Sequence, residues 1–328
     1  MSRTIHSSVL RTAIGILLVL SVFCAFSAQA GEPWKFIVCG DSRGKDNGVN
    51  AEILGPLAEQ IAKSGVDFIL FPGDLMTGSL LHSTSKKYLD QWRTTMAPVY
   101  KTGIKVYPIA GNHEWIDYNL PEAWRQEFPE LPDNGPKGEE KMTYSFTHKN
   151  ALVVGLDQYF NHRHEVDQKW LDKQLAARDA QTQPHVFVFG HEPAYAALHA
   201  DCMDNDEQAR DAFIQSLVDA GARLYFCGHD HFYNHAEIRG FLRNNQPVVF
   251  HQLIVGTAGA PIYHWKGQYG GKNGPGKTLA KMGHDEHAGS YCQVDVDDLT
   301  VTIKYVKRQD NGDYSVDETF SYTVPDSK

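Results

Sequence analysis

Five short apolar runs in this chain end in the same way, with a glycine followed at once by Asp, Asn or His. In chain order the junctions read CGDSRG, PGDLMTG, AGNHE, FGHEP and CGHDH. Short apolar runs bounded by glycine are typical of buried strands, and glycine lets the backbone turn sharply as it leaves a strand. If the five strand ends share one edge of the fold, their polar residues converge there.

Amphipathic segments separate the first of these runs. Residues 51–65 repeat apolar side chains at helical spacing and stop at Gly65, and residues 86–103 form a second such segment. The order strand, helix, strand, helix, strand predicts a largely parallel sheet covered by helices. Residues 114–141 are polar and rich in Pro and Gly, which indicates a long surface excursion.

The last third of the chain has a different pattern. Residues 246–261 and 298–324 alternate like strands, and Asn311-Gly312 suits a tight hairpin turn. Between them, residues 265–290 are rich in glycine and are expected to be mobile. No repeat or low-complexity linker divides residues 31–328, so we expect a single domain that contains two packed sheets.

Residues 1–30 have the features of a secretory leader. Arg3 and Arg11 precede an apolar run over residues 13–26, and Ala28-Gln29-Ala30 matches a small-x-small cleavage pattern. The run is about 14 residues long, short of the roughly 20 that span a bilayer. We therefore expect a cleaved signal peptide, a secreted or periplasmic protein and no stable membrane anchor; an uncleaved anchor is the alternative.

The net charge limits the possible binding partners, and the positions of the cysteines indicate which of them are free thiols. The formal net charge is -9 and the pI is near 5.9, which argues against a general affinity for nucleic acid or anionic lipid. Cys39 and Cys227 lie in apolar runs and are expected to be buried free thiols, whereas Cys202 and Cys292 could form a disulfide. The sequence does not indicate an oligomeric state.

The polar residues at the five junctions are all able to bind metal. A single junction of this kind could be an ordinary turn, but five together favour a site. Asp, Asn and His suit Mn, Fe or Zn better than Ca. Two metals about 3.5 to 4 Å apart need a shared carboxylate, and such pairs clamp the attacking and leaving oxygens of a phosphoryl displacement.

The five blocks, in this order, resemble those of the calcineurin-like metallophosphoesterase superfamily, which includes purple acid phosphatases. The resemblance spans roughly Asp41 to His231 and implies an α/β fold, a four-layer α/β/β/α sandwich with two central mixed sheets. It also implies two divalent or trivalent transition-metal ions. One metal would be held by Asp41, Asp74 and His231, and the other by Asp74, Asn112, His191 and His229, with Asp74 as the bridge.

The resemblance implies catalytic roles as well. A hydroxide formed on the metal pair would attack phosphorus, and His113 would protonate the leaving oxygen or bind the phosphate. Glu114 is expected to orient ligands rather than to act on substrate.

The first block departs from the family pattern. Most members have Asp-x-His where this chain has Asp41-Ser42-Arg43, and Thr77 stands where purple acid phosphatases have a tyrosine ligand. The first metal would keep three protein ligands, and the purple colour is expected to be absent. Arg43 could instead pair two phosphate oxygens, a geometry that suits arginine; the alternative is an ion pair with an acid.

These observations favour an exported metal-dependent phosphoric ester hydrolase that acts on small phosphomonoesters. One alternative is a phosphodiesterase for nucleotide or lipid head-group substrates. The other is a metal-dependent binding protein without turnover, which the altered first block favours and the presence of Asn112 and His113 disfavours.

Overall fold

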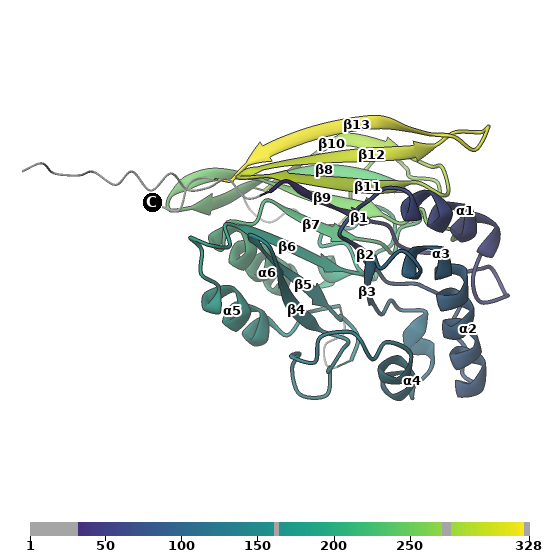
Figure 1. Ribbon diagram of the computed structural model, residues 1–328. Helices are drawn as coiled ribbons and strands as arrows, with labels where there is room; N and C mark the ends of the chain where they lie inside the picture. Colours follow the sequence, from purple (N-terminus) through teal and green to yellow (C-terminus); the bar gives the residue numbers. More distant parts are fainter. Residues whose placement is uncertain (1–31, 161–163, 271–276, 325–328) are drawn as a thin grey trace, which may run out of the picture. The chain divides into compact units, whose positions relative to one another are not determined.

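Two β-sheets organise the chain in a computed structural model, which describes residues 32–160, 164–270 and 277–324 (Figure 1). The first sheet has six strands in the order β13-β12-β11-β1-β2-β3. Its first three strands in the sequence run parallel to one another, and β11 pairs antiparallel with β1. The strands are β1 (Trp34–Val38), β2 (Phe68–Pro72), β3 (Lys105–Ile109), β11 (Tyr291–Asp297), β12 (Thr300–Arg308) and β13 (Tyr314–Thr323).

The second sheet has seven strands in the order β10-β8-β9-β7-β6-β5-β4. Strands β5, β6, β7 and β9 are parallel, and antiparallel strands flank them on both sides. The strands are β4 (Tyr144–His148), β5 (Ala151–Leu156), β6 (His185–Gly190), β7 (Leu224–Cys227), β8 (Tyr233–Arg243), β9 (Gln246–Val255) and β10 (Thr278–Asp285).

Helices cover the outer faces of the two sheets. Figure 1 shows α1, α2 and α3 beside the first sheet and α5 and α6 beside the second. Asp206 caps the start of α6 by accepting from the backbone N–H of Gln208 and Ala209. The helices are α1 (Ala51–Ala62), α2 (His82–Thr95), α3 (Ala97–Tyr100), α4 (Leu120–Glu127), α5 (Gln168–Ala177) and α6 (Glu207–Asp219), with short 3₁₀ turns η1 (Glu114–Ile116) and η2 (Met203–Asn205).

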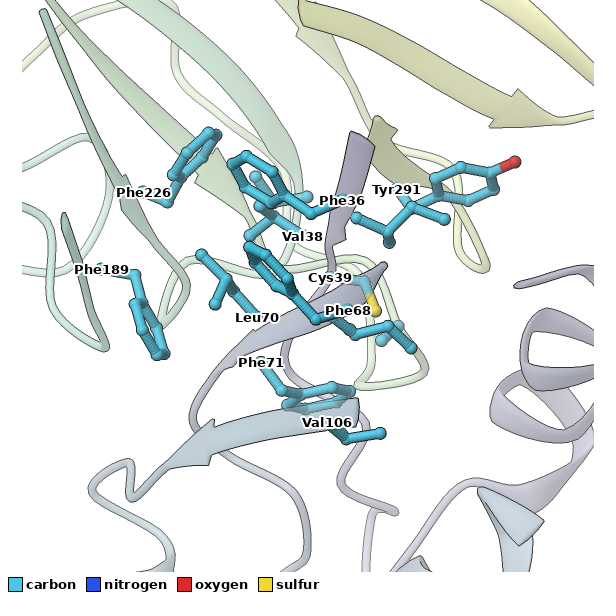
Figure 2. Close-up of a cluster of buried hydrophobic side chains, with 14 of the residues drawn as sticks. Phe36, Val38, Cys39, Phe68, Leu70, Phe71, Val106, Phe189, Phe226 and Tyr291 are labelled. Atoms are coloured by element: carbon cyan, nitrogen blue, oxygen red, sulfur yellow. The ribbon is translucent and has the colours of Figure 1, made fainter. Parts of the chain in front are cut away.

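Aromatic side chains fill the space between the sheets. The rings of Phe36 and Phe68, on adjacent strands of the first sheet, stack with centroids 5.0 Å apart. Phe187 of the second sheet meets Phe36 edge-on at 4.9 Å, and Figure 2 shows Phe189 and Phe226 approaching from the same side. This shared core holds the two sheets against each other.

The predicted fold is confirmed: two mixed sheets are layered with helices. Residues 114–141 are more ordered than a surface excursion, because they contain η1 and α4, whose Trp124 is buried. Of the segment 265–290 that we expected to be mobile, residues 271–276 lie outside the described residues, and the rest includes β10, which pairs with β8.

One of the two cysteine predictions is confirmed and the other is wrong. Cys39 and Cys227 are buried free thiols, as predicted. The disulfide between Cys202 and Cys292 is wrong, because both are free and buried. Cys292 lies in the core of the first sheet, whereas Cys202 precedes η2, which packs on α6 of the outer layer.

The predicted signal peptide lies outside the described residues, and residues 31–328 form one compact unit. Among the helices that the structure describes, none is long and apolar enough to cross a bilayer.

Candidate metal centre

The five strand-end junctions meet at one edge of the molecule. Asp41 follows β1, Asp74 follows β2, and Asn112 follows β3, while His191 and His229 follow β6 and β7. The backbone connects these loops directly. The N–H of Asp41 donates to the carbonyl of Gly73 at 3.1 Å, and between the sheets the N–H of Gly40 donates to the carbonyl of Val255, at the end of β9, at 2.9 Å. The two sheets therefore contribute to a single constellation.

Three of the converging residues have left-handed backbone conformations. The φ angles are 61° at Asp41, 52° at Asp74 and 70° at His229. Positive φ is uncommon outside glycine and costs on the order of 1–3 kcal/mol where the surrounding structure enforces it. Here hydrogen bonds enforce it, including that from the N–H of His229 to Oδ1 of Asp41 at 3.0 Å. Such strained positions cluster at functional sites.

The glycines of the junctions are required by close approach. A Cβ on Gly73, whose φ is +84°, would come within 2.5 Å of Nδ1 of His191. A Cβ on Gly228 would come within 2.2 Å of Oδ2 of Asp41. The sequence signal of glycine before each ligand thus reflects lack of space as well as a sharp turn.

Around Asn112, acceptor atoms face one another. Nδ1 of His191 lies 2.8 Å from the carbonyl of Pro72, which assigns the ring proton to Nδ1 and leaves the Nε2 lone pair free. That Nε2 lies 3.0 Å from Oδ1 of Asn112 and 3.4 Å from Oδ1 of Asp74. Nδ1 of His229 lies 3.2 Å from the same amide oxygen. Nε2 of His191 and Oδ1 of Asn112 are thus two acceptors in contact, an arrangement that a cation between them would stabilise.

The same arrangement recurs at His231. Its Nδ1 lies 2.8 Å from the carbonyl of Pro261, so its Nε2 lone pair faces Oδ1 of Asp41 at 3.6 Å. Ligand atoms of Asp41, Asp74 and His191 all lie within 4.8 Å of one another. Asp74, whose two oxygens face different partners, is placed to bridge the two groups.

The electrostatics of His191, His231 and Asp74 suit a metal centre, whereas the pKa values of Asp41 and His229 are both raised. Burial lowers the pKa of His191 to about 4 and that of His231 to about 3, so both rings are neutral at physiological pH. Burial opposes ionisation of Asp74, yet His191, His113, His231 and Arg43 together lower its pKa to about 2. Neutral imidazoles and an ionised carboxylate are the protonation states that bind metal. The donor set therefore fits borderline transition metals.

Arg43 occupies the place where most superfamily members have a histidine. Its Nε lies 3.6 Å from Oδ2 of Asp74, and its Nη2 donates to the hydroxyl of Tyr263 at 3.1 Å. Thr77 does not join the predicted metal ligands, because its hydroxyl donates to the carbonyl of Gly44 at 2.6 Å. Neither residue adds a metal-binding group.

His113 lies at the edge of the constellation. Its backbone N–H donates to Oδ1 of Asp74 at 3.1 Å, and its Nε2 is 3.9 Å from Oδ2 of the same carboxylate. The side chain is 23% exposed, so it is open to a bound substrate. Burial lowers the pKa of His113, and Asp74 partly offsets this.

The structure adds two residues that sequence reasoning missed. His199 lies with its ring centroid 4.9 Å from that of His229, and its Nδ1 is 2.5 Å from Oδ1 of buried Asp230. Tyr263 stacks on the ring of His231. Asp230, between the two histidines of GHDH, was the one sequence feature that could have pointed to a partner such as His199. Nothing in the sequence singled out Tyr263.

The sequence of the chain is similar to those of known phosphoesterases. The family model described as calcineurin-like phosphoesterase matches residues 35–233. Purple acid phosphatase 22 of Arabidopsis thaliana is 26% identical over 213 residues, which cover 61% of this chain and 45% of that protein. The chain thus matches less than half of that relative's length.

Two solved structures share the fold. Purple acid phosphatase PPD1 from yellow lupin (Lupinus luteus) seeds superposes with a TM-score of 0.64 at 16% identity, over 89% of this chain and 54% of that one. GAP50, the anchor in the inner membrane complex of Plasmodium, gives a TM-score of 0.56 at 19% identity, over 89% of both chains.

Proposed function

Because the chain belongs to the calcineurin-like phosphoesterase family, we propose that it is a metal-dependent hydrolase of small phosphomonoesters. One observation carries the proposal most directly. The unprotonated Nε2 of His191 faces the acceptor oxygens of Asn112 and Asp74, an arrangement that a bound cation would stabilise. A binding site for small organic molecules would not require such opposed acceptors.

The residues present fit two metals. Asp41, Asp74 and His231 would hold one, and Asp74, Asn112, His191 and His229 the other, with Mn, Fe or Zn as the candidates. When bound, the metals would supply Lewis acidity toward phosphoryl oxygens and lower the pKa of water for attack on phosphorus.

The chain's own residues would orient the substrate and transfer the proton. His113, partly exposed beside Asp74, would donate a proton to the leaving oxygen or a hydrogen bond to the phosphate. Arg43, whose side chain is 12% exposed, would neutralise a phosphate oxygen in an otherwise acidic protein. His199, held by Asp230, is a second candidate donor at the same edge.

A parallel assay tests this function. The protein, purified from an exporting host and stripped with EDTA, is reconstituted separately with Mn, Fe, Zn and Ca, and assayed on p-nitrophenyl phosphate and bis-p-nitrophenyl phosphate. We expect no turnover without metal, restoration by a transition metal, and faster cleavage of the monoester. Faster cleavage of the diester would favour a phosphodiesterase of nucleotides or lipid head groups.

A binding protein without turnover is the alternative from another class. It is favoured by the expectation of only three protein ligands at the first metal position. Full turnover by the metal-stripped protein would contradict the proposed mechanism. Metal binding without cleavage of either substrate would support the alternative.

We also propose that the protein is exported, with residues 1–30 removed as a signal peptide. The support is the charge, apolar run and Ala28-Gln29-Ala30 pattern of the leader. Sequencing the N-terminus of protein recovered from the periplasm or medium tests this, and a start at Gly31 is expected.

A further inference from the structure

Tyr263 is held in place by a predicted metal ligand. Its backbone N–H donates to the carbonyl of His231 at 3.1 Å, and its ring stacks on the His231 ring with centroids 4.1 Å apart and planes 12° from parallel. His231 in turn contacts the carbonyl of Pro261 through Nδ1 at 2.8 Å. A backbone hydrogen bond and a ring contact thus connect the segment that carries Tyr263 directly to His231.

The hydroxyl of Tyr263 is tied to Arg43. Nη2 of Arg43 donates to it at 3.1 Å, and Nε of the same guanidinium lies 3.6 Å from Oδ2 of Asp74. A phenol accepts and donates at once. Having accepted from Arg43, the hydroxyl keeps its own proton to donate, and within the described part of the chain that proton forms no hydrogen bond.

We propose that Tyr263 is a substrate-binding residue that, together with Arg43, hydrogen-bonds one unesterified oxygen of the phosphoryl group. The inference rests on the proposed phosphoesterase function and specifies the substrate class. Arg43 lies 3.6 Å from Asp74, and Tyr263 stacks on His231, which faces Asp41, so a phosphoryl group bound at the proposed metal centre would lie within reach of the pair. An anion is its natural occupant, since the pair combines a guanidinium cation with a hydroxyl that has its own proton to donate.

Such a pair favours monoesters over diesters. A phosphomonoester carries three unesterified oxygens and up to two negative charges, whereas a diester carries two such oxygens and one charge. A pair of donors that binds the additional charged oxygen of the monoester therefore contributes more binding free energy to the monoester than to the diester. In this way Arg43 and Tyr263 would give the altered first block a function in substrate choice.

Replacing Tyr263 with phenylalanine isolates the hydroxyl, because the ring that stacks on His231 remains. Tyr269→Phe is the matched control: it removes a hydroxyl from the same segment, where that group donates to Oδ1 of Asn234 at 2.8 Å and not to Arg43. The readouts are kcat/KM on the two nitrophenyl esters, the Kd of inorganic phosphate by calorimetry, and metal content.

For Tyr263→Phe we expect kcat/KM to fall about tenfold on the monoester and to change less than twofold on the diester. Phosphate binding should weaken about tenfold, which is the usual effect of losing one hydrogen bond to a charged group. Metal content and the Tyr269→Phe control should match the wild type. Unchanged phosphate affinity would overturn the inference. Equal losses of kcat/KM on both esters together with reduced metal content would also overturn it, because they would mean that Tyr263 only supports His231.

One further outcome would overturn it. If the Fe(III)-loaded wild type shows a visible phenolate-to-iron band that Tyr263→Phe removes, Tyr263 is a metal ligand and not a phosphate donor. If the wild type cleaves neither ester, the proposed function fails by itself, and the calorimetric phosphate affinities of the two variants still decide the role of Tyr263.

Discussion

The carboxylate of Glu114 holds the backbone of Asp74, because Oε2 of Glu114 accepts from the Asp74 N–H at 3.0 Å. The same carboxylate accepts from the N–H of Gly111 at 2.7 Å and from that of Met76 at 3.0 Å. Glu114 is fully buried. The loops after β2 and β3 are thus fixed relative to each other by a side chain that binds no ligand itself, as expected for a residue that orients ligands.

Glu114→Ala should therefore destabilise the protein strongly. The change leaves three buried backbone N–H groups without acceptors, and each costs about 1–3 kcal/mol. We expect the free energy of unfolding in urea to fall by about 3 kcal/mol or more. Glu122→Ala on α4, whose side chain makes only an exposed hydrogen bond, is the control and should change it by less than about 0.5 kcal/mol. Similar small changes in both variants would contradict this role.

Asn112→Leu should weaken metal binding without lowering the stability of the metal-free protein. The amide oxygen of Asn112 faces the lone pair of His191 at 3.0 Å, so an apolar side chain removes an unfavourable contact in the metal-free protein. We expect the metal-free Tm to be unchanged or higher, and the rise in Tm on adding Zn to be smaller than in the wild type. Exposed Asn119→Leu should keep the full rise. An undiminished Zn response in Asn112→Leu would remove Asn112 from the ligand set.

His113→Ala should lower kcat without unfolding the protein. Loss of a positioned proton donor typically costs about 10²–10⁴ in rate, so we expect kcat on p-nitrophenyl phosphate to fall at least about 100-fold. Circular dichroism and metal content should stay at wild-type values. His264→Ala, at a side chain that is 96% exposed, should retain full activity. Equal kcat in the two variants would exclude His113 from catalysis.

The metal-free protein should lose stability as the pH falls from about 6.5 toward 4. Burial lowers the pKa of His191 to about 4, so over this window the unfolded chain binds a proton that the folded chain does not. At 1.36 kcal/mol per pH unit, His191 alone accounts for on the order of 3 kcal/mol. Asp41 acts in the opposite direction, since burial and Asp74 raise its pKa.

The comparison of wild type with His191→Gln isolates the histidine from these other groups. Urea titrations of both metal-free proteins at a series of pH values should give a flatter pH dependence for the variant. Parallel curves would mean that His191 is not the neutral, buried ring inferred from its hydrogen bond to Pro72.

Local patterns in the sequence were enough to predict the fold class and most of the candidate site. Strand and helix periodicities are local properties, and the glycine before Asp41, Asp74, Asn112, His191 and His229 marks where each strand ends. The order of the five junctions predicted their convergence at one edge. The structure brings these residues together, and Thr77 does not join them, as the lost tyrosine ligand suggested.

Only the tertiary structure decided which residues surround that centre. Tyr263 reaches Arg43, and His199 reaches His229, across loops that no periodicity relates. The proposed Cys202–Cys292 bridge failed for the same reason, since the two thiols are buried in different layers. Hydrophobic patterns specify which face of a strand is buried, whereas contacts between loops depend on how the two sheets pack, and that packing is a property of the whole core.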